Sequence, residues 1–135
     1  MNEFIKAAWK RLPDLEPQHI SKILWAIARL RYTPEDDFLH AMAHAASQKQ
    51  FTDFEPQELS QCLWGFARLD YDPGKGFLKQ FVHASQKQLP NFESQSLASI
   101  LWAFERLRYD PGEKLLQEVI DAWHSLADFE PQEFE

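Results

Sequence analysis

Apolar residues recur along the chain with the three- and four-residue spacing of amphipathic helices. One such stripe consists of Ile20, Ile23, Leu24, Ile27 and Leu30. This i, i+3, i+4, i+7 pattern places the side chains on one side of a helix. Seven segments with this spacing predict an all-α chain of about seven helices. Their expected ranges are about 3–12, 17–31, 34–49, 56–70, 73–88, 94–108 and 111–126.

The helices form pairs that repeat every 38–39 residues. The string L-W-x-x-x-R-L-x-Y-x-P begins at Leu24, Leu63 and Leu101, so its tryptophans are 39 and 38 residues apart. A unit of this kind buries its apolar side by stacking on its neighbours. We therefore expect one α-solenoid domain over residues 1–135, built from antiparallel helix pairs. Its expected units are 1–33, 34–72, 73–110 and an incomplete 111–135.

Proline marks the expected start of both helices in a pair. The first helix follows a residue that can cap it and then a proline, at Thr33-Pro34, Asp72-Pro73 and Asp110-Pro111. These pairs predict an N-cap followed by proline at the first helical position. The second helix is expected to open in the same way at Pro17, Pro56 and Pro131. Residues 130–135 begin one more helix of the second kind, so a partner or missing repeats would cover an uncapped apolar end.

The composition suits a folded core. Apolar residues make up 44% of the chain, with 11 Phe, 5 Trp and only 4 Gly, unlike the composition of a disordered segment. The chain contains no run of about 18 apolar residues, so the sequence predicts no membrane span. The first residues carry neither a signal peptide nor a transit peptide pattern. The single cysteine, Cys62, excludes an internal disulfide framework and occupies a place that holds isoleucine in the other units, which predicts a core position.

The residues give no sign of catalysis. A glycine-rich phosphate loop, a serine-centred elbow and an activated Cys/His pair are all lacking, so we expect no enzyme and no cofactor. His40 and His44 lie four residues apart near Asp36 and Asp37, a spacing that can hold a metal. However, the sequence has no HExxH string and no second cluster, and His83 occupies the place of His44 in the next unit. We therefore expect no metal site.

The repeated string, preceded by F-x-P-Q-x-L as in Phe54–Leu59, resembles the octotricopeptide repeat. The resemblance covers nearly the whole chain and implies an α-solenoid. It also implies binding of single-stranded RNA, roughly one nucleotide per repeat, in RNA processing, stability or translation within a chloroplast or mitochondrion. Some related repeat proteins are instead subunits of organellar assemblies. DNA is not an expected partner.

Candidate ligand-facing residues are the polar positions that vary between units on the early turns of the first helix of each pair. They are Asp36, Asp37, His40, Lys75, Lys79, His83, Glu113, Lys114 and Gln117. Such side chains can hydrogen-bond base edges, although they equally suit a solvated surface.

Residues that are identical in every unit are expected to be mainly architectural. The repeated tryptophans and tyrosines predict packing between helices, although an indole can also stack on a base. The arginines of the string are Arg29, Arg68 and Arg106. They either contact phosphates or complement the negative end of the helix dipole.

The charge balance leaves two functions open. The chain has 14 Lys+Arg against 21 Asp+Glu, a net charge of −7, whereas nucleic-acid binding draws on cations that neutralise phosphates. An RNA-binding module therefore requires a basic strip on the concave side. A protein-binding scaffold, such as a subunit of a ribosome or of a membrane-associated energy-converting assembly, requires apolar contacts instead. If Lys75, Lys79, Lys114 and the repeated arginines share one face, RNA is favoured.

Overall fold

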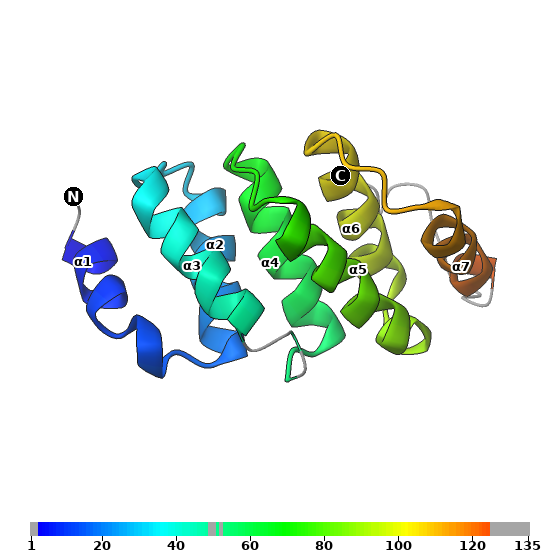
Figure 1. Ribbon diagram of the computed structural model, residues 1–135, viewed down its shortest axis with the longest axis horizontal. Helices are drawn as coiled ribbons and strands as arrows, with labels where there is room; N and C mark the ends of the chain where they lie inside the picture. Colours follow the sequence, from blue (N-terminus) through cyan, green and yellow to red (C-terminus); the bar gives the residue numbers. More distant parts are fainter. Residues whose placement is uncertain (1–2, 49–50, 52, 125–135) are drawn as a thin grey trace.

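The computed structural model describes residues 3–48, 51 and 53–124, and every regular element in this part of the chain is helical (Figure 1). The α-helices are α1 (Glu3–Lys10), α2 (Pro17–Arg29), α3 (Asp36–Gln48), α4 (Pro56–Arg68), α5 (Lys75–Gln88), α6 (Ser94–Arg106) and α7 (Glu113–His124). Short 3-10 turns at Leu12–Asp14 and Leu89–Asn91 precede α2 and α6. The all-α repeat architecture is confirmed.

The helices form two layers. In Figure 1, α1, α3, α5 and α7 lie in front, and α2, α4 and α6 lie behind them. We call these the A helices and the B helices. The B helices contact one another extensively, whereas successive A helices touch at few points. Because the B helices are more closely spaced, the B layer is the inner side of the array.

Small residues allow the close approach of the B helices. A Cβ atom added to Gly65 of α4 would lie 2.9 Å from Leu24 Cβ and 3.1 Å from the Leu24 carbonyl oxygen of α2. The same two helices are joined by a hydrogen bond of 2.8 Å from Ser21 Oγ to the Glu58 carbonyl oxygen. Glycine thus gives space between two backbones here and does not serve a special dihedral angle.

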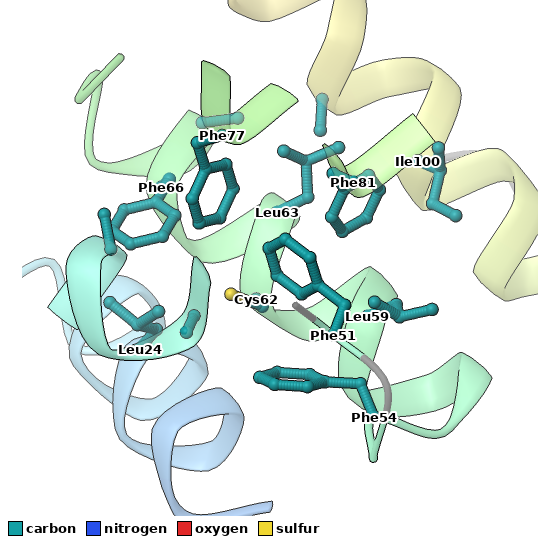
Figure 2. Packing of buried hydrophobic residues seen from close by; sticks show 14 of the residues in the cluster. Leu24, Phe51, Phe54, Leu59, Cys62, Leu63, Phe66, Phe77, Phe81 and Ile100 are labelled. Carbon is teal, nitrogen blue, oxygen red and sulfur yellow. The ribbon is translucent and has the colours of Figure 1, made fainter. Parts of the chain in front are cut away.

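Aromatic side chains fill the space between the layers. Phe51 and Phe54, from the loop between α3 and α4, point into the core beside Phe77 and Phe81 of α5 (Figure 2). The Phe51 ring meets those of Phe77 and Phe81 edge-on, with centroids 5.1 and 5.6 Å away. Edge-to-face pairs of this kind add roughly 0.5–1.5 kcal/mol beyond the area they bury. Phe51 and Phe54 are therefore part of the core.

Cys62 lies in this core and is fully buried (Figure 2). Burial raises the pKa of the Cys62 thiol far above its ordinary range, because the thiolate would be desolvated. The expected core position of this cysteine is confirmed, and the thiol remains protonated.

Each B helix ends in the same hydrogen-bonded turn. In α4, Asp70 has φ 57°, and the Tyr71 N–H donates to the Phe66 carbonyl oxygen at 2.9 Å. The Tyr71 ring then packs on Phe66, with centroids 5.5 Å apart. This is a Schellman turn with its apolar contact. The tyrosines at the same position in the other units, Tyr32 and Tyr109, make the same backbone bond, so the predicted packing role of these tyrosines is confirmed.

The predicted starts of α3, α5 and α7 are wrong by two residues, whereas α1 begins at Glu3 as predicted. Asp72 does not cap a helix at Pro73; instead, its Oδ1 accepts from the Gly74 N–H at 2.8 Å, and α5 begins at Lys75. Gly74 has φ 101°, which favours glycine, and its carbonyl oxygen accepts from the Leu78 N–H. The pair Asp110 and Gly112 repeats this turn before α7, and α3 likewise begins at Asp36 rather than Pro34.

The predicted starts of the B helices are confirmed where the structure describes them. Pro17 and Pro56 occupy the first helical position of α2 and α4. The Glu55 N–H just before α4 donates to Glu58 Oε1 at 3.0 Å, and Glu16 donates similarly to His19 Nδ1. A side chain at the third helical position thus accepts from the N-cap N–H, as in a capping box. The third predicted start, Pro131, lies outside the described residues.

Candidate functional site

The outward side of the B helices carries a pattern that repeats in register across all three helices. It is formed by residues spaced i, i+4, i+7 and i+11, which share one side of a helix. The four rows are Gln18, Gln57 and Gln95; Lys22, Gln61 and Ser99; Trp25, Trp64 and Trp102; and Arg29, Arg68 and Arg106. We call these rows the Trp/Arg surface.

A groove of about 270 Å³ crosses this surface and confirms that the rows are neighbours in space. Its lining comes from all three B helices: Trp25, Arg29, Ser60, Gln61, Trp64, Gln95 and Ser99. The walls combine indole rings, carboxamides, hydroxyls and a guanidinium group. Such a lining can stack on a flat ring and hydrogen-bond its edge.

In α2 and α6 the arginine lies over the tryptophan of the same helix. The Arg29 guanidinium carbon lies 4.8 Å from the centroid of the Trp25 ring, and Arg106 lies 5.6 Å from that of Trp102. Both distances fall within the range of cation–π contacts. The rings of Trp64 and Trp102 are 6.3 Å apart and tilted by 34°. The indoles therefore pack on neighbouring side chains, yet Trp25 remains 36% exposed and accessible to a further ring.

The charge of the Trp/Arg surface is opposite to that of the whole chain. Its rows contain Lys22 and three arginines but no carboxylate, although the net charge of the chain is −7. One carboxylate, that of Asp70, lies beside it and accepts from Arg106 Nε at 2.9 Å. The hydrogen bond from Arg106, together with the charges of Arg106 and Arg68, lowers the pKa of Asp70. The same hydrogen bond raises the pKa of Arg106.

The arginines therefore differ in availability. Arg106 forms an ion pair with Asp70, whereas within the described residues Arg29 and Arg68 form none, although the charge of Arg68 also acts on Asp70. Each of the three is the last residue of its helix, where a cation also complements the helix dipole. The position of these arginines agrees with the role at the helix dipole, whereas the contact with phosphates stays a prediction.

The ligand-facing candidates from the sequence lie on the A helices. All of them are exposed: Asp36, Asp37 and His40 on α3, Lys75, Lys79 and His83 on α5, and Glu113, Lys114 and Gln117 on α7. The lysines and the repeated arginines consequently lie in different layers and do not form one basic strip. The structure does bring Lys75, Lys79 and His83 together along α5, which contains no acidic residue.

Other kinds of site find little support in the described residues. Within residues 3–48, 51 and 53–124, no three His, Cys, Asp or Glu side chains come together in a group that could hold a metal. In the same part of the chain, no helix is both long and apolar enough to span a bilayer.

Two rows of the Trp/Arg surface were not among the candidates from the sequence: the constant row Gln18, Gln57 and Gln95, and the variable row Lys22, Gln61 and Ser99. Lys22, Gln61 and Ser99 vary between units, and variation was sought only on the A helices. The signal was available, because these residues lie three positions before each tryptophan on the same side of the helix. What the sequence did not reveal is that this side of the B helices carries a groove.

The chain is similar to one family of known proteins. Neither the curated proteins nor the solved structures contain a significant match. Residues 1–126 of the 135 match the family model described as the Tbc2 translation factor, N-terminal domain. The match spans all described helices of both layers. The chain therefore belongs to the family of Tbc2 translation factor N-terminal domains.

Proposed function

We propose that the chain is a non-catalytic octotricopeptide-repeat module that binds single-stranded RNA in organellar RNA processing, stability or translation. Membership in a translation factor family supports an RNA-related role. The observation that carries the proposal is the Trp/Arg surface, whose rows combine four cations with three indoles on an otherwise acidic chain, with Asp70 beside Arg106. An acidic protein can bind RNA when its basic groups are concentrated in this way.

Stacking supplies the first part of the binding. An aromatic ring stacked on a base contributes about 1–3 kcal/mol per base, and any base can take part. A base inserted between the rings of Trp64 and Trp102 would need a ring separation of about 6.8 Å, which is twice the ~3.4 Å spacing of stacked bases. These rings are 6.3 Å apart, so bases stack on exposed faces or enter the groove between Trp25 and Trp64.

The spacing of the helices sets the conformation of the RNA. Packed helices lie about 8–10 Å apart, well beyond the 3.4 Å rise of stacked bases. Successive B helices therefore contact successive nucleotides only when the strand is extended and its bases are unstacked. Single-stranded RNA can adopt this conformation and a duplex cannot.

Arginine supplies the second part of the binding. Arg29 and Arg68 are at the same helical position and have no carboxylate partner within the described residues. Each phosphate neutralised by a cation adds about 0.7 to the slope of log affinity against log salt for a single strand. Two such contacts therefore contribute a slope of about 1.4.

The experiment measures the affinity of the purified chain for short random-sequence RNA at several salt concentrations by fluorescence anisotropy. Substitution of both Arg29 and Arg68 by alanine is expected to weaken binding and to lower the salt slope by about 1.4. The matched control replaces Lys75 and Lys79 on α5, and it is expected to retain the affinity and slope of the wild type. Loss of binding in the lysine variant alone would move the site to the A helices.

A protein-binding scaffold is the second candidate function. Leu30 is 78% exposed and Phe4 is 53% exposed. In the other two units the position of Leu30 is held by Leu69 and Leu107, which pack against the core. An exposed leucine at a position that is otherwise packed suits contact with a protein. If the chain binds no RNA even at low salt, the RNA proposal fails and the scaffold becomes the working function.

A further inference from the structure

The row Lys22, Gln61 and Ser99 differs in kind from the other three rows of the Trp/Arg surface. The other rows hold glutamine, tryptophan or arginine in every unit, which gives each unit the same general contacts. In this row, one unit offers an ammonium group, the next a carboxamide and the third a hydroxyl. Surface positions that vary while their neighbours stay constant can distinguish one ligand group from another.

The position of Gln61 shows that this row belongs to the groove. Gln61 and Ser99 both line it, together with Trp25, Trp64 and Gln95. Lys22 is exposed on α2 at the equivalent position. The row therefore lies directly beside the rings on which bases would stack, where it meets the edge of a stacked base.

Gln61 also has an unused hydrogen-bonding group. Its Oε1 atom is shielded from solvent and has no hydrogen-bond partner in the part of the chain that the structure describes. Buried acceptors without a partner are uncommon in native proteins, and each calls for an explanation. Rotation of the Gln61 carboxamide about its last torsion would turn this acceptor into the groove, where a ligand that donates a hydrogen bond would supply the missing partner.

We propose that Lys22, Gln61 and Ser99 are the specificity-determining residues of the Trp/Arg surface, each contacting the base edge of one of three successive nucleotides. The inference rests on the proposed function and adds to it which residues distinguish one base from another. Lysine only donates and suits the O6 and N7 acceptors of guanine. Glutamine donates and accepts and suits the N6 and N7 of adenine, whereas a serine hydroxyl suits either kind of edge.

The test exchanges two residues between units. In the double variant, Gln61→Ser and Ser99→Gln place in each unit a side chain that the fold already holds at that position. RNA selected from a random pool by the wild type is expected to show base preferences on the order of tenfold at individual positions. In the double variant, the preferences at two adjacent positions should change places, while affinity for the unselected pool stays close to that of the wild type.

The control is Gln80→Ser, which makes the same chemical change on the exposed side of α5. It should leave the selected sequence unchanged. A separate variant, Lys22→Gln, should alter only the base preference at the nucleotide that Lys22 contacts. Because Lys22 is exposed, this variant keeps the test valid if the double variant fails to fold.

The outcomes separate this inference from the function on which it rests. If the wild type binds RNA and the exchange leaves its base preferences unaltered, the assignment of these residues is wrong while RNA binding stands. If the wild type binds no RNA, both fall together. A preference that shifts equally in the Gln80→Ser control would also overturn the assignment.

Discussion

Gly65→Ala tests whether close packing of the B helices shapes the Trp/Arg surface. The added Cβ would lie 2.9 Å from Leu24 Cβ and 3.1 Å from the backbone carbonyl oxygen of Leu24. Contacts under 3.0 Å are not tolerated, and a backbone atom cannot rotate away as the end of a flexible side chain can. Helices α2 and α4 must therefore separate slightly.

The free energy of unfolding changes through two opposing effects. Alanine in place of glycine within a helix stabilises it by about 1 kcal/mol. Overpacking costs about 1–3 kcal/mol, depending on how far the neighbours move. The equivalent residue Ala103 is fully buried at the next interface, so these helices can accommodate a Cβ after relaxation. We therefore expect a net destabilisation of about 1 kcal/mol.

Gly76→Ala is the matched control, because a Cβ added there meets nothing within 4 Å. This variant should be more stable than the wild type by up to about 1 kcal/mol. Urea unfolding followed by tryptophan fluorescence would measure both changes. Equal stabilisation by the two substitutions would refute the reasoning, since it would show that the contact with Leu24 does not limit the spacing of the helices.

Two further predictions concern the turns and the core. Arg108→Gly should raise the free energy of unfolding by about 1 kcal/mol, because Arg108 is exposed with φ 57°, where a non-glycine residue costs about 1–2 kcal/mol. A lower urea midpoint would contradict this and show that the arginine side chain holds the turn. Because burial raises the pKa of the Cys62 thiol, this thiol loses its proton in the unfolded state at a lower pH than in the folded state. The free energy of unfolding should therefore fall by about 1.4 kcal/mol per pH unit above the ordinary thiol pKa of 9.0. The measurement is urea unfolding of the wild type and of Cys62→Ala between pH ~8 and ~10. If both proteins show the same pH dependence, the Cys62 thiol is not its cause.

The repeat made most of the fold predictable from the sequence. The spacing of Trp25, Trp64 and Trp102 implied equivalent helices, and equivalent helices must stack because none can bury its apolar side alone. The predicted ranges therefore placed each helix within about two or three residues.

The starts of the A helices could not be read in the same way. Asp before Pro fits both an N-cap and a turn closed by a bond to the second following residue. In two units the glycine that follows, Gly74 or Gly112, adopts φ near 100° and lets the turn precede the helix. Helix α3 begins equally late with Glu35 in place of the glycine, so the glycine is not the sole cause. Where a local motif is compatible with both an N-cap and a turn, the surrounding backbone determines which of the two forms.

The functional surface was the least predictable part, and the reason lies in the spacing of the two layers. Sequence repetition shows which residues are equivalent, but it does not show which layer is more tightly packed. Gly65 and Ser21 bring α2 and α4 together, and that closeness places Trp25 and Gln61 at one groove. Repetition then has two consequences at once. The constant residues must hold neighbouring helices at one distance, and under the proposed function the same constancy would give every unit an equal stacking and phosphate contact. Only a position that neither sets the helix spacing nor makes the repeated contact can differ between units. On this surface, that position is occupied by Lys22, Gln61 and Ser99.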